Sequence, residues 1–297
     1  MLPSILKSSF WKVRNLLLPG APDRVIVYGT HSSDWMNALS PGAPVWSRMP
    51  CIREVSLRDA GRNRPPRFPF IDSRTVVIPL LEHHIVRCPR NYLSLIPDST
   101  ALLHFSDKAN FSTYAERHGL SAHCPAHYRR VMDAVFPCVI KRAELNGGVG
   151  VALVNSYEEL QALFGQEMWN GKKFILQAFV PGTTEYVTHC VCKDGKILWH
   201  WSMEYELPSA ETMKAAGKHK STRPCSISAR NLAIIEKFLA PIAYSGPCNV
   251  DYKLTEEGDI LVMEINPRLG GSLMFPLHVD ALKEALTCIV ENARLPA

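Results

Sequence analysis

The chain has 297 residues, of which 46% are hydrophobic and 21% charged, a composition typical of a folded protein with several subdomains. Its net charge of +5 favours a small polyanion as ligand and is too small to indicate nucleic-acid binding. The sequence contains no apolar run of about 18 residues, which is the length that would predict a membrane span. The nine irregularly spaced cysteines predict reduced, mostly buried thiols in a cytoplasmic protein.

The N-terminal third combines short buried strands with long polar connections. Residues 1–20 mix apolar and basic residues without a signal-peptide core, which predicts an amphipathic helix packed on the body, with a membrane-surface helix as the alternative. Residues 24–28, RVIVY, predict a strand followed by a Gly/Ser loop. The Pro- and Arg-rich stretch 40–70 predicts loops with a short strand near 51–57.

A second buried strand is predicted at 75–82, TVVIPLLE, and it ends at Glu82. The end of such a strand often faces a ligand in an open parallel sheet, so Glu82 is a candidate substrate residue. A charge that begins a helix is the alternative role for this side chain.

Helix and strand patterns alternate through the middle of the chain. A helix at 106–120 has Ser106 or Asp107 as its N-cap and Gly119 at its end. The other predicted elements are strands at 138–142, 149–154 and 172–180, helices at 156–165, 226–243 and 276–293, and hairpins at 181–207 and 246–267. In the first hairpin, Asp194-Gly195 favours a type I′ turn, which would place His189 opposite His200.

Residues 208–224 carry several cations and little apolar periodicity, which predicts a mobile loop. Lys218, Lys220 and Arg223 could reach an anionic ligand if this loop closes as a lid, and a merely solvated loop is the alternative.

The second hairpin gathers polar groups on one face. With a loop at 256–259, Thr255 faces Ile260, Asp251 lies opposite Glu264, and Asn249 lies opposite Asn266. Side chains alternate along a strand, so all four polar groups share one side, while Val250, Tyr252, Met263 and Ile265 cover the other. Opposed residues have Cβ atoms about 4.5–5.5 Å apart, where two carboxylates repel unless a cation joins them.

Hard oxygen ligands of this kind suit Mg²⁺ (or Mn²⁺), and Arg268 just beyond the strand could bind a phosphate or carboxylate oxygen. A solvent-facing hairpin with incidental acids is the alternative, although the apolar run ILVMEI indicates a buried strand. The glycine cluster NGGVG is by itself a plain turn. It follows Lys141, a cation inside an apolar strand, and this pairing makes a phosphate-binding loop the second interpretation.

These motifs, in this order over residues 70–290, resemble the ATP-grasp superfamily of carboxylate–amine ligases. The resemblance implies an α/β (α+β) ATP-grasp fold. It has an N-terminal α/β pre-ATP-grasp domain at 1–100, and ATP is clasped between subdomains at 101–180 and 181–297. It also implies that the enzyme uses ATP and Mg²⁺ to form an acyl phosphate, which an amine then converts to an amide.

The resemblance assigns roles to individual residues of this chain. Lys108 and Lys141 match the two phosphate-contacting lysines, and Glu185 matches the acid that binds ribose hydroxyls. Asp251, Glu264 and Asn266 match the metal ligands, and Arg268 matches the catalytic arginine. The remaining nucleotide-binding positions lie in the glycine-rich loop and in the adenine-reading segment: Asn146, Gly147, Gly148, Gly150, Gln177, Ala178, Phe179 and Val180. Gln177 and Ala178 depart from the glutamate that many relatives carry nearby, and main-chain contacts would survive that change.

Arg223, Arg268, Gly270 and Gly271 join Glu82 as candidate substrate residues. The expected partners are a small carboxylate and an amine, supplied by an amino acid or small peptide, with no nucleic acid and no membrane. A homodimer is an open alternative. An ATP-grasp kinase and a nucleotide-binding regulatory protein are the alternatives. His83, His84, His189 and His200 are structural or substrate-facing, and the sequence does not choose between these roles.

Overall fold

The computed structural model describes residues 21–59, 72–143, 145, 149–211 and 219–295. The helix expected at residues 1–20 lies outside this range. The chain divides into two compact units, one formed by residues 1–95 with 274–297 and the other by residues 96–273. In this division the last segment, 274–297, groups with residues 1–95, and the expected boundaries at 100 and 180 stay predictions.

The N-terminal unit is built on a parallel sheet in the order β2-β1-β3-β4. Its strands are β1 (Arg24–Tyr28), β2 (Glu54–Arg58), β3 (Asp72–Pro79) and β4 (Tyr92–Leu93). The central strand β1 is almost fully apolar, and it pairs in parallel with both β2 and β3. RVIVY has no alternation of polar and apolar residues because this strand is paired on both edges and buried on both faces.

The described part of this unit also contains the helices α2 (Ser33–Leu39), α3 (Pro44–Ser47), α4 (Glu82–Val86) and α9 (Val279–Asn292). The last helix is held here by ion pairing between Arg48 and Asp280 and by a backbone bridge between Ser94 and Arg294. Glu82 is the first residue of α4, as expected for a charge that begins a helix.

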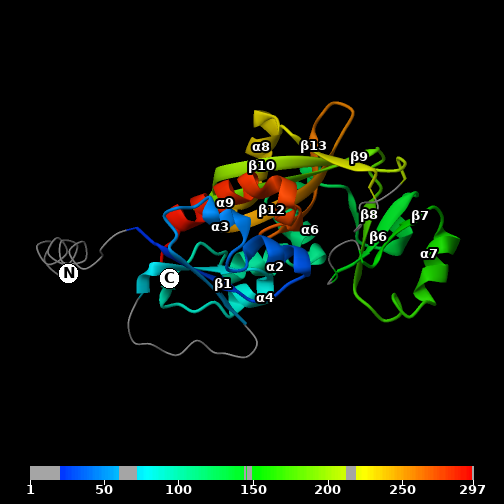
Figure 1. The fold of residues 1–297 in the computed structure, drawn as a ribbon. Coiled ribbons are helices and arrows are strands. Elements are labelled where there is room, and N and C mark those ends of the chain that lie inside the picture. Colours follow the sequence, from blue (N-terminus) through cyan, green and yellow to red (C-terminus); the bar gives the residue numbers. More distant parts are fainter. Residues whose placement is uncertain (1–20, 60–71, 144, 146–148, 212–218, 296–297) are drawn as a thin grey trace, which may run out of the picture. The chain divides into compact units, whose positions relative to one another are not determined.

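The second unit contains a small sheet in the order β5-β8-β6-β7. Its strands are β5 (His127–Tyr128), β6 (Cys138–Arg142), β7 (Val151–Val154) and β8 (Phe174–Ala178). The helix α7 (Tyr157–Phe164) lies beside this sheet (Figure 1). Its Leu160 packs with Cys138, Ile140 and Leu176 on one face of the sheet. Lys141 and Gln177 alternate with these residues and therefore lie on the opposite face.

A five-stranded antiparallel sheet in the order β11-β10-β9-β12-β13 completes the second unit (Figure 1). Its strands are β9 (Thr184–Lys193), β10 (Lys196–Glu206), β11 (Ser221–Cys225), β12 (Gly246–Leu254) and β13 (Ile260–Asn266). One face packs against the helices α5 (Ser99–Phe105), α6 (Lys108–Arg117) and α8 (Ala229–Leu239). The α8 helix is followed by a short 3₁₀ turn at Ala240–Ile242, and Ser121–His123, Val131–Asp133, Gly271–Met274 and Pro276–His278 form similar turns.

The segment 208–224 is not a loop throughout, which corrects the sequence prediction. Its last residues form β11, which pairs with β10 and brings Arg223 opposite Glu204. Residues 212–218, including Lys218, lie outside the described range, so the lid stays a prediction. All nine cysteines are described as free thiols, four of them buried and four half-buried. No helix within the described ranges is long and apolar enough to cross a membrane.

Candidate functional site

The polar face of the β12–β13 hairpin has the predicted pairing. Asp251 lies opposite Glu264, and Asn249 lies opposite Asn266. Asn249, Asp251 and Asn266 are only 7–8% exposed, so this is a buried polar face and not the solvent-facing hairpin considered as an alternative.

The oxygens of the two acids converge on a single point. The Asn266 Nδ2 donates hydrogen bonds to Asp251 Oδ2 at 3.2 Å and to Glu264 Oε1 at 3.1 Å. Asn249 Nδ2 donates a third bond of this cluster to Asp251 Oδ2, also at 3.2 Å. The Asn266 amide nitrogen therefore occupies the position between the two carboxylates that a cation would take. Rotation of this amide by about 180° would turn its oxygen toward the carboxylates and make it available as a metal ligand.

This donor set fits Mg²⁺, which takes one or two protein carboxylates and completes its shell with other oxygens. Within the described ranges no group of three or more His, Cys, Asp and Glu side chains could hold a metal. Two acids and one amide therefore suit a hard cation that shares its ligands with phosphates, and they do not suit a structural zinc site.

The turn of the same hairpin differs from the prediction. Leu254, and not Thr255, lies opposite Ile260, and a bulge between the turn and Asp251 restores the pairing at the site. The bulge also moves Met263 out of the apolar face, where Val262 is buried in its place.

Lys108 is the first residue of α6, and its side chain reaches the polar face of the hairpin. Of the two expected caps, Ser106 and Asp107, it is Asp107 that caps the helix by accepting hydrogen bonds from the backbone N–H groups of Ala109 and Asn110. The Lys108 Nζ lies 3.6 Å from Glu264 Oε2 and donates to the Leu145 carbonyl at 2.5 Å. The first predicted lysine thus contacts a predicted metal ligand 156 positions away in the chain.

Lys141, on β6 of the small sheet, interacts electrostatically with Glu264 and Glu185. Burial lowers the pKa of its ammonium, while Glu264 and then Glu185 oppose this shift. Gln177 lies on the same face of the sheet, is 3% exposed, and its Oε1 accepts no hydrogen bond within the described part of the chain. A buried acceptor without a donor is costly, so this position is suited to a ligand N–H group.

The glycine-rich loop is described only in part. Asn146, Gly147 and Gly148 lie outside the described residues, so their phosphate role stays a prediction. Gly150 has a φ of +66°, and a Cβ there would lie 2.6 Å from Arg142 Cγ. Its carbonyl accepts the Arg142 backbone N–H at 2.8 Å, which closes the turn between β6 and β7. This glycine is therefore required by the backbone itself.

A buried lysine that the sequence reasoning missed holds the connection between the two sheets. Lys253 Nζ donates to the carbonyls of Val180 and Gly182 at 2.9 Å and 3.2 Å. It shares the polar face with Asp251, two residues earlier on β12, and with Glu185, which is 5% exposed. The period-two alternation that revealed Asn249 and Asp251 was the available signal for Lys253.

The loop after β13 carries Arg268, whose Nη1 donates to the Leu269 carbonyl at 3.1 Å. Directly after it, Gly270 has no room for a side chain, because a Cβ would lie 2.2 Å from His189 Cε1. His189 is 1% exposed, and its Nε2 lies 2.7 Å from Ser272 Oγ. This histidine therefore sets the path of the loop that presents Arg268.

The predicted pairing of His189 with His200 is wrong. A bulge between Ile197 and Trp199 shifts the β9–β10 register, so that His189 lies opposite Trp201 and His200 lies opposite Cys190. The Asp194-Gly195 turn itself has the predicted left-handed backbone, with φ values of 51° and 80°. The turn signal was therefore correct, and the extra residue beyond it was not recognised.

The remaining candidate substrate residues are dispersed. Arg223 forms an ion pair with Glu204 on the exposed edge of the sheet. Gly271 begins a 3₁₀ turn after Gly270. Glu82 belongs to the N-terminal unit, and its substrate role stays a prediction.

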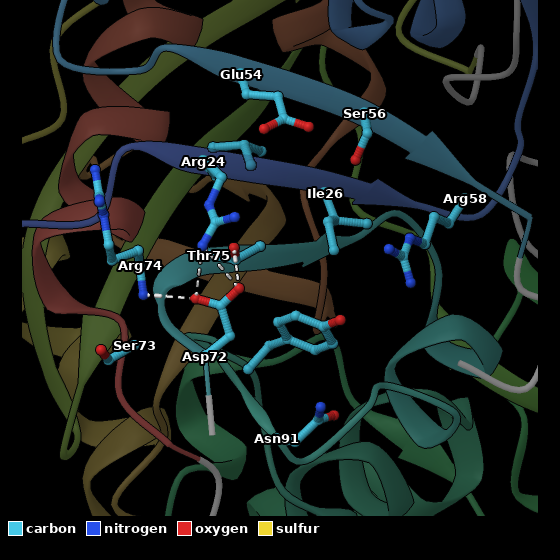
Figure 2. Close-up of a pocket in the computed structure, with 12 residues that line it drawn as sticks. Arg24, Ile26, Glu54, Ser56, Arg58, Asp72, Ser73, Arg74, Thr75 and Asn91 are labelled. Carbon is cyan, nitrogen blue, oxygen red and sulfur yellow. Dashed lines mark hydrogen bonds and ion pairs between the residues drawn. The ribbon is translucent and has the colours of Figure 1, made fainter. Parts of the chain in front are cut away.

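A cavity of about 450 Å³ lies against β1, β2 and β3 in the N-terminal unit (Figure 2). Figure 2 shows Arg24 and Thr75 turned toward the Asp72 carboxylate, which accepts hydrogen bonds from both. Burial raises the pKa of Asp72, but these bonds and the Arg74 backbone N–H outweigh it and leave the pKa below its usual value. The charges lining this cavity thus hold the strand ends together, and residues 60–71, which connect β2 to β3, lie outside the described range.

A family model adds evidence that is independent of this geometry. The model described as carbamoyl-phosphate synthase L chain, ATP-binding domain, matches residues 104–276, more than half of the chain. The protein belongs to this ATP-grasp family. The match begins just before Lys108 and ends after Arg268, so it includes the whole polar face and both lysines.

Solved structures of similar fold span most of the chain. Phosphoribosylamine–glycine ligase from Thermotoga maritima has a TM-score of 0.64 at 17% identity, over 92% of this chain and 76% of that one. N5-carboxyaminoimidazole synthase from Aspergillus clavatus, in complex with ADP and 5-aminoimidazole ribonucleotide, has a TM-score of 0.61 at 15% identity, over 93% and 78%. L-amino acid ligase from Bacillus licheniformis has a TM-score of 0.58 at 13% identity, over 90% of this chain and 75% of that one. At these identities the ATP-grasp fold is shared.

Proposed function

We propose that the protein is an ATP-dependent carboxylate–amine ligase that forms an amide and releases ADP and phosphate. The observation that supports this most directly is the convergence of Lys108, Lys141, Asp251, Glu264 and Asn266 at one buried face. Positive and negative groups gather there without forming an apolar core, as a site for a charged ligand and a cation requires.

The residues of this face have distinct roles in the proposal. Asp251, Glu264 and Asn266 hold Mg²⁺, which when bound neutralises charge on the ATP phosphates. Lys108 and Lys141 add positive charge to the phosphate site, and the Gln177 Oε1 accepts from the exocyclic amine of adenine. Glu185 binds the ribose hydroxyls.

Catalysis in this proposal depends on position and charge. A substrate carboxylate oxygen attacks the γ-phosphorus, ADP leaves, and an acyl phosphate forms. The amine then attacks the acyl carbon, phosphate leaves with its bonding electrons, and the amine loses a proton. Arg268 stabilises negative charge on the transferred phosphoryl group and on the tetrahedral intermediate. Excluding water protects the acyl phosphate from hydrolysis.

The proposed substrates are an amino acid or small peptide as carboxylate and a second such molecule as amine. Three of the similar structures bear the names of enzymes that act on glycine, on amino acids or on an aminoimidazole nucleotide, and this supports the class without choosing a member. A cytoplasmic location and Mg²⁺ dependence are part of the same proposal.

Measuring ADP release across paired amino acids and small carboxylates tests this function. With an active pair we expect ADP and phosphate in equal amounts, together with a product whose mass equals the two substrates less one water. ADP release that no carboxylate stimulates would contradict the proposal.

Hydroxylamine separates ligation from phosphoryl transfer to a hydroxyl. An acyl phosphate yields a hydroxamate with this reagent, whereas the phosphorylated alcohol made by a kinase yields none. ATP binding without ADP release over the same panel would instead indicate a regulatory nucleotide-binding protein.

A further inference from the structure

The connection between the small sheet and the five-stranded sheet is only five residues long, from Phe179 to Thr183. It is anchored on the side of the larger sheet by three kinds of contact. Gly182 N donates to the Ala210 carbonyl at 3.3 Å, and Leu207 N donates to the Thr183 carbonyl at 2.7 Å. The third anchor is the side chain of Lys253.

Lys253 makes a close contact with this connection at three points. Its Nζ donates to Val180 O at 2.9 Å and to Gly182 O at 3.2 Å, and it lies 5.6 Å from the centroid of the Phe179 ring. The residue is 4% exposed, so a desolvated ammonium depends on these acceptors. The hydrogen bonds are charge-assisted, which makes them stronger than those between neutral groups.

The position of Lys253 on β12 adds a link to the rest of the polar face. Tyr252 lies opposite Tyr186, so Lys253 and Glu185 are the next residues on two neighbouring strands. Glu185 attracts the ammonium electrostatically. Asp251 is two residues away on the same side of the strand. One side chain therefore joins the connection, the ribose-binding acid and the metal-binding strand.

We propose that Lys253 is a positioning residue that fixes the Phe179–Gly182 backbone against the five-stranded sheet, and thereby sets the protein's affinity and selectivity for the adenine base. This inference rests on the proposed nucleotide site, in which the segment from Gln177 to Val180 reads adenine and the backbone held by Lys253 continues directly from it. Lys253 touches neither phosphate nor reacting atoms in this role, so its effect belongs to binding of the base and not to the chemical step.

The test compares two ligands in Lys253→Met, a variant that keeps the length of the apolar part of the side chain and removes its ammonium group. ATP contacts the base site and the phosphate site, whereas inorganic tripolyphosphate contacts the phosphate site alone. Isothermal titration in the presence of Mg²⁺ gives both dissociation constants. We expect the dissociation constant for ATP to rise about tenfold to a hundredfold, because the backbone that contacts the base shifts when Lys253 no longer holds it. The constant for tripolyphosphate should stay within about twofold, as for an independent site.

Lys196→Met is the matched control, because Lys196 is an exposed lysine on β10 whose ion pair is with Glu236. It should change neither constant. An unchanged ATP constant in Lys253→Met would overturn the inference. An equal loss of both ligands would overturn it as well, because that pattern indicates general damage to the fold.

Gly182→Ala tests the same idea from the other side of the connection if Lys253→Met does not fold. Gly182 has a φ of +130° and no atom within 4 Å of an added Cβ, so the substitution strains the backbone without a collision. A selective loss of ATP affinity supports the inference, and unchanged affinity overturns it. If the wild-type protein binds ATP but never ligates, the ligase proposal fails while this inference stands. If it does not bind ATP, both fail.

Discussion

The two faces of the β12–β13 hairpin are both largely buried, but one is apolar and the other is polar. On the helix-covered face, Val250 and Ile265 are 0% exposed, and they pack in the core formed with α5, α6 and α8. On the other face, Asn249, Asp251 and Asn266 are 7–8% exposed. Neighbouring residues of one strand, such as Ile265 and Asn266, thus belong to opposite environments.

This difference shows that burial does not by itself indicate a stabilising role. The apolar face gains free energy from leaving water. The polar face loses hydration, and its lysines and acids offset that loss only in part. We therefore expect substitutions on the apolar face to reduce stability with little effect on activity, and substitutions on the polar face to do the reverse.

The strongest test of this contrast is Glu264→Ala. The variant removes a ligand from the proposed metal site, and ADP formation should fall about 10³-fold, equivalent to about 4 kcal/mol of transition-state stabilisation. The free energy of unfolding should change by less than about 1 kcal/mol. Glu257→Ala, in the exposed turn of the same hairpin, is the control and should change neither quantity. A large loss of stability in Glu264→Ala would remove the distinction between the faces.

Gly270→Ala tests whether the polar face also sets the path of the arginine loop. The added Cβ would collide with the His189 ring and displace Arg268, so kcat should fall about 10²-fold. Gly165→Ala is the control, since its nearest neighbour would be the Ala162 carbonyl at 3.5 Å. The double variant Gly270→Ala/His189→Ala should recover part of the activity because removal of the ring makes room. Additive losses in this cycle would contradict the steric explanation.

The titration of Lys141 gives a pH-dependent test. Burial lowers its pKa in the free protein, and bound phosphates favour the ammonium and raise the pKa again. Nucleotide binding should therefore take up a proton at pH values between the free and bound pKa. ATP affinity should fall by up to about tenfold per pH unit as pH rises through that window. Titration calorimetry in two buffers of different ionisation enthalpy measures the uptake. Lys141→Arg, which stays charged, should show none.

The smallest expected change belongs to the apolar face. Ile265→Val removes one buried methylene group beside Glu264 and should lower the free energy of unfolding by about 1 kcal/mol. The KM for ATP should stay at the wild-type value, because the β13 backbone and the two polar neighbours of Ile265 keep their positions. Denaturant unfolding and steady-state kinetics check both expectations. A raised KM with unchanged stability would reverse the assignment of the two faces.

The local features of the fold could be predicted from the sequence because they depend on local chemistry. Strand periodicity placed Asn249, Asp251, Glu264 and Asn266 on one face, and Asp107 was one of two residues expected to cap the helix. These signals need only the spacing of side chains and the preferences of single residues.

Bulges could not be predicted, because an extra strand residue has no distinctive composition. On β13 the bulge compensated for an incorrect turn, so the pairs at the site were still right. On β10 nothing compensated, and His189 was placed opposite the wrong residue. The contact of Lys253 with Val180 spans 73 positions, and α9 joins the N-terminal unit from the far end of the chain. Contacts of such range depend on the folded chain and not on local sequence.

The bulge on β13 has a consequence for how this hairpin tolerates insertions and deletions during evolution. A one-residue change in an ordinary antiparallel turn moves every later side chain to the opposite face of the sheet. Here the bulge lies between the turn at Thr255–Asp259 and the pair formed by Asp251 and Glu264. Gaining or losing that bulge compensates for a turn that is one residue longer or shorter. The tip of the hairpin can therefore vary in length among descendants of this chain while the acids keep their partners.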